Sequence, residues 1–172
     1  LKIKFSAMRI EEEIKLDYSD VLFRPKRSTL KSRKEVDLTR TYKFKHSKRE
    51  WEGVPIIASN MDGVGELEVA NSLSKFKILT ALTKQHDVNS INNFKPIKAI
   101  FNFVALSCGT SKESYDRLNS IISEHTYVQF ICIDVANGYS ENFSHFVASV
   151  REKYPSKTII AGNVVTADMT QE

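Results

Sequence analysis

The feature that most constrains the fold is a unit that recurs five times after residue 53: a short apolar run, a polar end, and a stretch with helical apolar spacing. The runs are nearly continuous in apolar residues instead of alternating, which is typical of strands buried on both faces of a parallel sheet. Strands that alternate with helices in this way indicate an α/β fold. The runs are residues 54–62, 77–84, 101–110, 127–138 and 158–166.

The spacing of these units fits two architectures, because an open doubly wound sheet and a (β/α)8 TIM barrel both alternate strands with helices. No G-x-G-x-x-G follows the first apolar run, which weighs against a dinucleotide-binding Rossmann sheet. A complete barrel takes about 250 residues, whereas this chain has 172. If the fold is a barrel, residues 54–172 supply roughly its first five strands. We then expect the physical protein to be longer, or another chain to supply the rest.

Residues 1–53 have a different character and are predicted to form an N-terminal arm. Residues 1–50 hold 15 Lys and Arg against 8 Asp and Glu, a net charge of +7, whereas residues 51–172 have a net charge of −3. The basic loop Arg24–Lys34 contains six Lys or Arg and no acidic residue. Such a loop is either a solvated surface or a binder of phosphate, on nucleic acid or on a small nucleotide. Nucleic acid is not favoured, because no aromatic residues are interleaved with the charges.

Two segments before residue 54 are predicted to be short strands. Val21–Phe23 is apolar and precedes a break at Pro25. Tyr42 and Phe44 indicate a strand near the edge of a sheet.

Composition excludes several classes of protein. No apolar run approaches the ~18 residues of a membrane-spanning helix, and residues 1–7 lack the apolar core of a secretory signal. Two Cys exclude a disulfide scaffold, and neither the Cys nor the four His have the spacing of metal ligands. We therefore predict a cytoplasmic globular protein with no membrane or nucleic-acid partner and no metal site in this chain.

Polar residues or glycines end all five apolar runs. Because the carboxyl ends of parallel strands form the active face of α/β folds, these residues are predicted to meet at one polar mouth. Each alone also has a structural explanation, since Asx residues cap helices and glycine eases turns. The residues are Asn60, Met61 and Asp62; Thr83 and Lys84; Ser107, Cys108, Gly109 and Thr110; Asp134, Asn137 and Gly138; and Gly162 and Asn163.

Lys84 is the strongest candidate for chemistry. A lysine at the mouth of a barrel can bind phosphate, or lose its charge when desolvated and act in acid–base catalysis. Asp134 follows a buried run and needs a partner, which is either Lys84 across the mouth or a ligand. The alternative is an ion pair with a structural role only.

The two cysteines are weaker candidates. Cys132 lies between two isoleucines and is predicted to be a buried apolar residue. Cys108 is nearer the mouth, where a thiol nucleophile is conceivable although no general base is evident.

Four stretches resemble the IMP dehydrogenase/GMP reductase family: DVLFRPKRSTLKSRKEVDLTR, GVPIIASNMDGVG, CIDVANGYSENF and AGNVVTADM. The resemblance runs from about Met8 to Glu172, and RPKRSTLKSR and DVANGYS resemble the reductase branch of the family. It implies a (β/α)8 barrel, usually a homotetramer. It also implies NADPH-dependent reductive deamination of GMP to IMP and ammonia, in which a Cys attacks the purine C2 and forms a covalent thioimidate.

The resemblance assigns roles to residues of this chain. Ser32 and Arg33 match a pair that contacts NADPH, and this NADPH is expected to be bound by a neighbouring subunit. Lys84 and Asp134 match catalytic positions that assist the departure of ammonia. The cofactor side of the mouth is matched by Lys84, Asp134, Val135 and Ala136, and the substrate side by Asn60, Met61, Asp62 and Asn163.

The match to the family is incomplete. The family's catalytic Cys loop, potassium-binding carbonyls, acid–base Thr and GMP phosphate site follow the fifth strand, so this fragment alone is predicted to be inactive. The family also has Thr at the position of Gly63 and His at those of Thr83 and Gln85. Two alternatives stay open: an IMP dehydrogenase, and a truncated non-catalytic fragment that binds nucleotide.

Overall fold

The computed structural model of the chain describes residues 12, 14–95 and 97–172. The chain divides into two compact units, Leu1–Val36 and Asp37–Glu172. In the described part of the first unit every residue is exposed, and the regular elements are single 3-10 turns at Tyr18–Asp20 and Arg33–Glu35. All strands of the described chain belong to the second unit.

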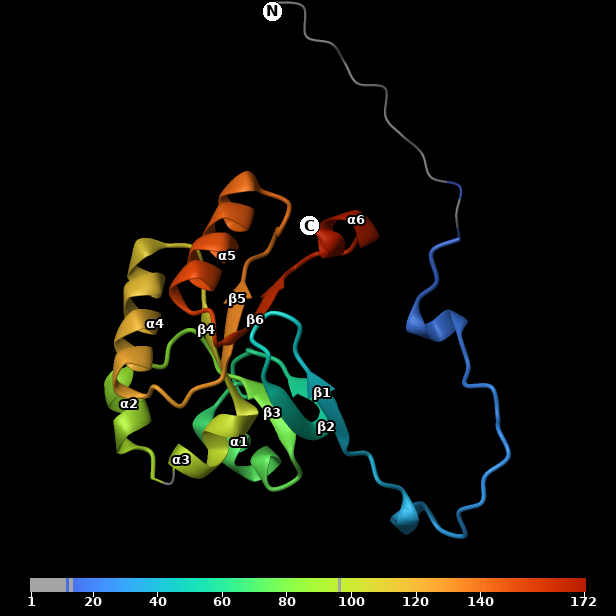
Figure 1. Cartoon of the computed structure of the whole chain (residues 1–172). Helices are drawn as coiled ribbons and strands as arrows, with labels where there is room; N and C mark the ends of the chain where they lie inside the picture. Colours follow the sequence, from blue (N-terminus) through green and yellow to red (C-terminus); the bar gives the residue numbers. More distant parts are fainter. Residues whose placement is uncertain (1–11, 13, 96) are drawn as a thin grey trace, which may run out of the picture. The chain divides into compact units, whose positions relative to one another are not determined.

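Six strands form one sheet whose spatial order follows the sequence order (Figure 1). β1 (Arg40–Lys43) is antiparallel to β2 (Glu50–Ala58), and all later neighbours are parallel. The later strands are β3 (Ile78–Ala81), β4 (Val104–Cys108), β5 (Phe130–Asp134) and β6 (Thr158–Gly162). A doubly wound sheet reverses its strand order at a switch point, whereas this order runs in one direction, as in a barrel. The prediction of a partial (β/α)8 barrel with five parallel strands is confirmed.

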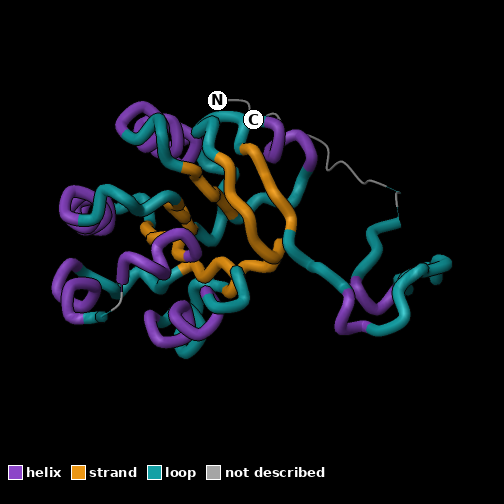
Figure 2. Tube along the Cα trace, turned by 60° about the horizontal axis from the view of Figure 1, so that its bottom comes forward, coloured by secondary structure: helices purple, strands orange, loops and turns teal. Residues whose placement is uncertain are grey.

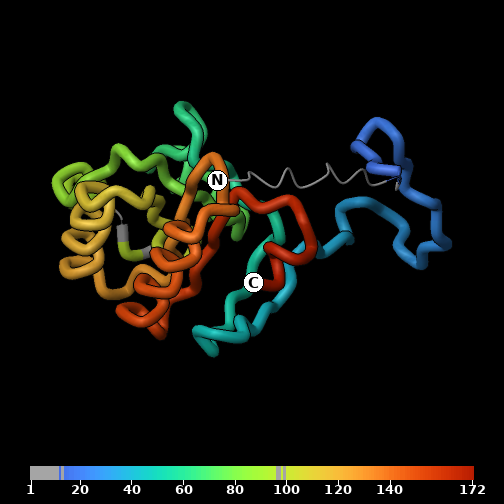
Figure 3. Tube along the Cα trace, turned by 90° about the horizontal axis from the view of Figure 1, so that it is seen from above, coloured from blue at the N-terminus to red at the C-terminus, as the bar shows by residue number. Residues whose placement is uncertain are grey.

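Helices connect the parallel strands and lie along one side of the curved sheet (Figure 2). α4 (Lys112–Glu124) and α5 (Glu141–Lys153) lie side by side (Figures 1 and 3), and the rings of Tyr115 and Phe146 meet between them with centroids 5.3 Å apart. The shorter helices are α1 (Leu67–Ser74), α2 (Val88–Asn93), α3 (Ile97–Ile100) and α6 (Ala167–Gln171), with a 3-10 turn at Phe101–Phe103. Along the described ranges, every helix falls short of the length and apolar character that a bilayer crossing requires.

The outer face of the sheet and the helices enclose the main hydrophobic core. Alternate residues of two central strands enter it: Val104 and Leu106 from β4, and Ile131 and Ile133 from β5. Leu118 of α4 belongs to the same cluster. Burial of these side chains from water is the main favourable contribution to this packing.

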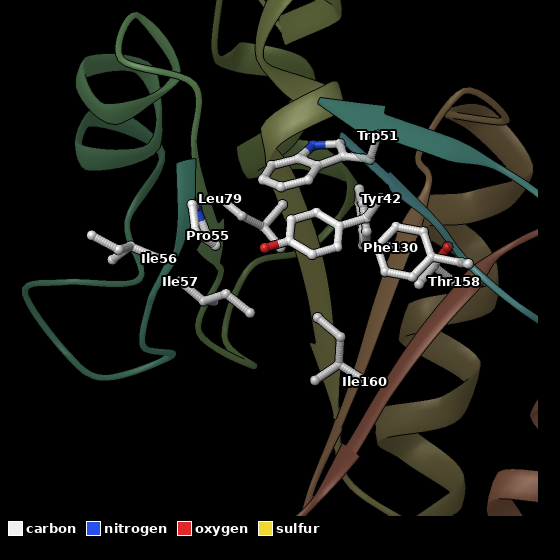
Figure 4. Close-up of a pocket in the computed structure, with 10 residues that line it drawn as sticks. Tyr42, Trp51, Pro55, Ile56, Ile57, Leu79, Phe130, Thr158 and Ile160 are labelled. Atoms are coloured by element: carbon white, nitrogen blue, oxygen red, sulfur yellow. The ribbon is translucent and has the colours of Figure 1, made fainter. Parts of the chain in front are cut away.

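The inner face of the sheet is also apolar, which is why the strand sequences are nearly continuous in apolar residues. Phe130 of β5 and Trp51 of β2 meet edge-on with ring centroids 6.1 Å apart, and the Trp51 Nε1–H donates to the backbone oxygen of Asn102 at 2.9 Å. These rings border a hollow of about 230 Å³ (Figure 4). Ile56 and Ile57 at this hollow are 56% and 52% exposed, so the inner apolar face is open to solvent. The full lining is Tyr42, Phe44, Trp51, Pro55, Ile56, Ile57, Leu79, Phe130, Thr158 and Ile160.

Two local predictions differ from the structure, and one is confirmed. Val21–Phe23 is not a strand, because β-prone composition alone does not supply the backbone partner that a strand needs. The first barrel strand begins at Glu50 instead of Val54, because its first residues pair with β1. The edge strand predicted around Tyr42 is confirmed as β1, but it ends at Lys43, so that Phe44 and the residues directly after it lie outside the strand.

Candidate functional site

The carboxyl ends of the parallel strands lie along one edge of the sheet, as strand register requires. Asp134, the last residue of β5, pairs with Gly162, the last residue of β6. Cys108 at the end of β4 pairs with Ile133 of β5. Lys84 follows the end of β3 at the same edge. The loops after these strands therefore hold the residues of the predicted mouth.

Lys84 and Asp134 are in direct contact. The Lys84 Nζ lies 2.8 Å from Asp134 Oδ2 and donates a hydrogen bond of 2.9 Å to the backbone oxygen of Asp134. Their side chains are 40% and 33% exposed, so the pair is accessible to a ligand. An ammonium group has three N–H donors, and these two contacts occupy two of them. Because partly exposed ion pairs contribute only about 0–1 kcal/mol to stability, folding alone gives a weak reason for this pair.

The loop that carries Lys84 is fixed to the loop between β2 and α1. Thr83 is buried, and its N–H donates to the backbone oxygen of Gly65 at 2.9 Å. His86 Nε2 lies 3.3 Å from Glu66 Oε2 and 3.3 Å from the same Gly65 oxygen. Glu66 occupies the N-cap position of α1 without making a side-chain cap bond, so its carboxylate serves the contact with His86 instead. Gln85 is exposed.

Sequence reasoning missed the pairing of His86 with Glu66. It considered His86 only as a metal ligand, for which the spacing of the histidines is wrong. The two residues lie on different loops, so their contact depends on the tertiary fold. A glutamate at a helix N-cap, where Ser, Thr, Asp and Asn are preferred, was the available signal.

The loop after β2 brings three predicted substrate-side residues to this edge. Asn60 is half-buried, whereas Met61 and Asp62 are exposed. The backbone oxygen of Met61 accepts from the N–H groups of Val64 at 3.0 Å and Gly65 at 2.8 Å, which closes a tight turn. Gly63 within this turn has φ of +75°, a backbone conformation that favours glycine. The turn therefore favours glycine at position 63, where the resemblance implies Thr.

The ends of β5 and β6 stay joined beyond the strands. The Val135 N–H donates to the Gly162 oxygen, and the Asn163 N–H donates to the Val135 oxygen, each at 2.9 Å. Val135 is half-buried, whereas Ala136 and Asn163 are exposed. Backbone hydrogen bonds thus hold the predicted cofactor segment next to Asn163, one of the predicted substrate-side residues.

The two cysteines lie where expected along their strands, but their burial is the reverse of the expectation. Cys108 is fully buried on the helix-facing side of the sheet, whereas Cys132 is half-buried and packs against the inner cluster. Alternation decides this, because the side chains of the paired residues Cys108 and Ile133 both enter the outer core. Burial raises the pKa of the Cys108 thiol to about 12 and also raises the pKa of Cys132. Neither thiol is therefore prepared to act as a nucleophile near neutral pH.

Ser32 and Arg33 belong to the first unit, Leu1–Val36. The Ser32 hydroxyl accepts from the Lys34 N–H at 3.3 Å and caps the 3-10 turn that begins at Arg33. Both residues are exposed. Within the described ranges, no cluster of three or more His, Cys, Asp or Glu could hold a metal ion.

Comparison with known proteins gives the same family by sequence and by structure. The family model described as "IMP dehydrogenase / GMP reductase domain" matches residues 15–172. Proteins named GMP reductase from Citrobacter koseri and Photobacterium profundum are each 51% identical over 167 residues, which are 96% of this chain and 48% of each relative. The chain thus spans about half the length of the curated relatives it matches.

A solved structure shows the same architecture. The inosine 5′-monophosphate dehydrogenase of Legionella pneumophila superposes with a TM-score of 0.67 at 26% identity, over 86% of this chain and 44% of that chain. The family model, the relatives and the fold agree, and the chain belongs to the IMP dehydrogenase/GMP reductase family.

Proposed function

We propose that the full-length protein is a GMP reductase that converts GMP to IMP and ammonia with NADPH. The observation that carries this proposal is the 51% identity to proteins named GMP reductase over 96% of the chain. The contact between Lys84 and Asp134 at those strand ends supports it. The two free cysteines suit a reducing compartment such as the cytoplasm.

The proposed reaction is a two-step substitution at purine C2. A Cys of the full-length protein, beyond this chain, adds to C2 as a thiolate, and the exocyclic amine leaves as ammonia. Hydride then adds to C2 and the thiolate leaves, so GMP, NADPH and two protons become IMP, NADP⁺ and ammonium. The covalent thioimidate divides one difficult displacement into two easier steps. A monovalent cation such as potassium is proposed to bind beyond this chain as well.

Lys84 is proposed to control a proton at the mouth. Its ammonium group is held by Asp134 through two contacts, which leaves one N–H directed to neither of them. That N–H is suited to hydrogen-bond the departing amine or to transfer a proton to it. Asp134 orients the lysine, because its carboxylate and its backbone oxygen both contact the Lys84 Nζ.

The segment after β5 is suited to hold the cofactor. The Lys84–Asp134 pair offers a donor and an acceptor within reach of solvent, and the small side chain of Ala136, two residues after Asp134, is also exposed. Bound NADPH would supply the hydride. Asn60, Met61, Asp62 and Asn163 are proposed to face the nucleotide substrate.

The N-terminal arm is proposed to bind the phosphates of NADPH. Arg33 is exposed and follows the capping residue Ser32, within a region of net charge +7. A guanidinium group binds phosphate through two parallel hydrogen bonds, so Arg33 suits a phosphorylated dinucleotide. We propose that Ser32 and Arg33 serve the cofactor of a neighbouring subunit in a homotetramer.

An IMP dehydrogenase is the second candidate, because the solved structure that matches this fold is one. The two activities are separated by following the nicotinamide absorbance of the full-length protein with each substrate pair. We expect NADPH to be oxidised when GMP is added, and no reaction when GMP is omitted. Formation of NADH from NAD⁺ and IMP, without oxidation of NADPH by GMP, would instead establish the dehydrogenase.

A further inference from the structure

Tyr139, in the loop between β5 and α5, holds the backbone that follows β6. Its phenolic oxygen accepts from the N–H of Val165 at 2.9 Å and from the N–H of Thr166 at 2.8 Å, and its hydroxyl lies 3.1 Å from Thr166 Oγ1 as a donor. A phenol has one donor and can accept two hydrogen bonds, so its full capacity is used here. The hydrogen bond between Tyr139 and the Thr166 side chain, together with those from these amides, lowers the pKa of Tyr139.

The contact begins where the strand ladder ends. Beyond the strands, backbone hydrogen bonds join the loop after β5 to the loop after β6. Val135 pairs with Asn163, and the last bond is from the Gly138 N–H to the Asn163 oxygen at 2.9 Å. The next N–H groups that the structure pairs with this loop are those of Val165 and Thr166, and both bind the Tyr139 oxygen. One side chain therefore extends the sheet contact to the start of α6.

Each residue of the segment Asn137–Ser140 has a distinct part in this contact. Asn137 Oδ1 accepts from the Tyr139 N–H at 3.0 Å, an Asx turn that fixes the direction of the chain. Gly138 permits the close approach, because a Cβ there would lie 2.6 Å from the Asn163 oxygen. Ser140 caps α5 by accepting from the Phe143 N–H at 3.2 Å. Tyr139 thus projects from a backbone that is fixed on both sides.

We propose that Tyr139 is a positioning residue, which holds the segment Asn163–Thr166 against the strand end that carries Asp134 and Ala136. Its effect on turnover rests on the proposed function, because Asn163 and Asp134 belong to the two sides of the proposed mouth. Tyr139 itself needs no contact with substrate or cofactor. Its function is to keep the two sides at a fixed separation.

The test is Tyr139→Phe in the full-length protein, because this change removes one oxygen and keeps the ring. We expect amide hydrogen exchange at Val165 and Thr166 to become about fivefold faster, since each amide loses its hydrogen bond to the Tyr139 oxygen. We also expect kcat with GMP and NADPH to fall roughly several-fold, while KM for GMP changes less than about twofold. Such a fall in kcat at nearly constant KM is what loss of positioning in the transition state produces.

Tyr154→Phe is the matched control. It also removes a phenol oxygen, but that oxygen donates to Asn119 Oδ1 at 2.5 Å between the outer helices α5 and α4. The control should leave exchange at Val165 and Thr166 and the value of kcat unchanged.

Two results would overturn the proposal: unchanged exchange at both amides in Tyr139→Phe, or faster exchange with kcat equal to that of the wild type. Absence of GMP-dependent NADPH oxidation in the wild type would instead refute the proposed function. Even if the wild type lacks this activity, hydrogen exchange at the Val165 and Thr166 amides still tests whether Tyr139 holds this segment.

Discussion

At the scale of single residues, position along a strand could be predicted from the sequence, but the face that a side chain occupies could not. Lys84 and Asp134 were identified because each follows a buried run, and strand ends gather at one edge in any parallel sheet. Cys108 and Cys132 were assigned to the wrong environments, because runs buried on both faces give no signal of which residues point inward. The contact of His86 with Glu66 joins separate loops, and local sequence does not specify it.

Gly63 gives a prediction at this scale. Its φ of +75° is strained for residues with a Cβ, although no atom lies within 4 Å of the position that a Cβ would take. Gly63→Ala should therefore lower the free energy of unfolding by about 1 kcal/mol through backbone strain alone. Gly109→Ala is the control, because its Cβ would meet only Ser114 Oγ at an ordinary 3.9 Å and its φ is not in the positive region. Denaturant titration of both variants measures the difference, and equal stabilities would contradict the argument.

The buried thiol of Cys108 predicts a dependence of stability on pH. Burial raises its pKa from 9.0 to about 12, so the native state keeps a proton that the unfolded chain loses above about pH 9. Its contribution to stability is complete below that pH and declines as the pH rises towards 12. Between these values the wild type should lose up to about 1.4 kcal/mol more per pH unit than Cys108→Ala. Urea denaturation across this range measures both slopes, and parallel slopes would show that the thiol is not buried as described.

At the scale of elements, the existence and order of strands could be predicted, whereas their ends depended on partners distant in the sequence. Five apolar runs became five parallel strands, because their composition suits burial on two faces. β2 begins earlier than its apolar run because β1 pairs with its first residues. Val21–Phe23 shows the converse, since it has strand-like composition but no strand.

The link between two strand-end loops gives a prediction at this scale. His86 and Glu66 join the loop of Lys84 to the loop of Asn60, with side chains 13% and 35% exposed. His86→Gln, Glu66→Gln and the double variant should show a coupling of about 0.5–1 kcal/mol in unfolding free energy, as partly exposed pairs do. We expect this coupling because His86 Nε2 and Glu66 Oε2 lie 3.3 Å apart. Strictly additive effects would show that the two side chains do not interact.

At the scale of the whole molecule, the sheet has one covered face and one open face. The helices enclose the outer core, whereas the inner hollow exposes Ile56 and Ile57 to solvent. Further strands of a barrel would bury this apolar surface at roughly 25 cal/mol per Å². Sequence patterning predicted both apolar faces, but it could not show that the mouth residues of separate strands make direct contact. That contact is the basis of the proposed chemistry.

The Lys84–Asp134 pair is proposed to act in the reaction and not only in the fold. Steady-state kinetics of Lys84→Ala in the full-length protein test this role most directly. Lys75→Ala is the control, because Lys75 is an exposed lysine at the C-terminal end of α1. We predict that kcat for NADPH-dependent reduction of GMP falls by about 10²–10⁴-fold, as loss of a proton-transfer group does, while GMP affinity changes little. The control should retain the wild-type kcat. A Lys84→Ala protein that keeps its kcat, or that loses kcat and GMP affinity to the same extent, would contradict the claim.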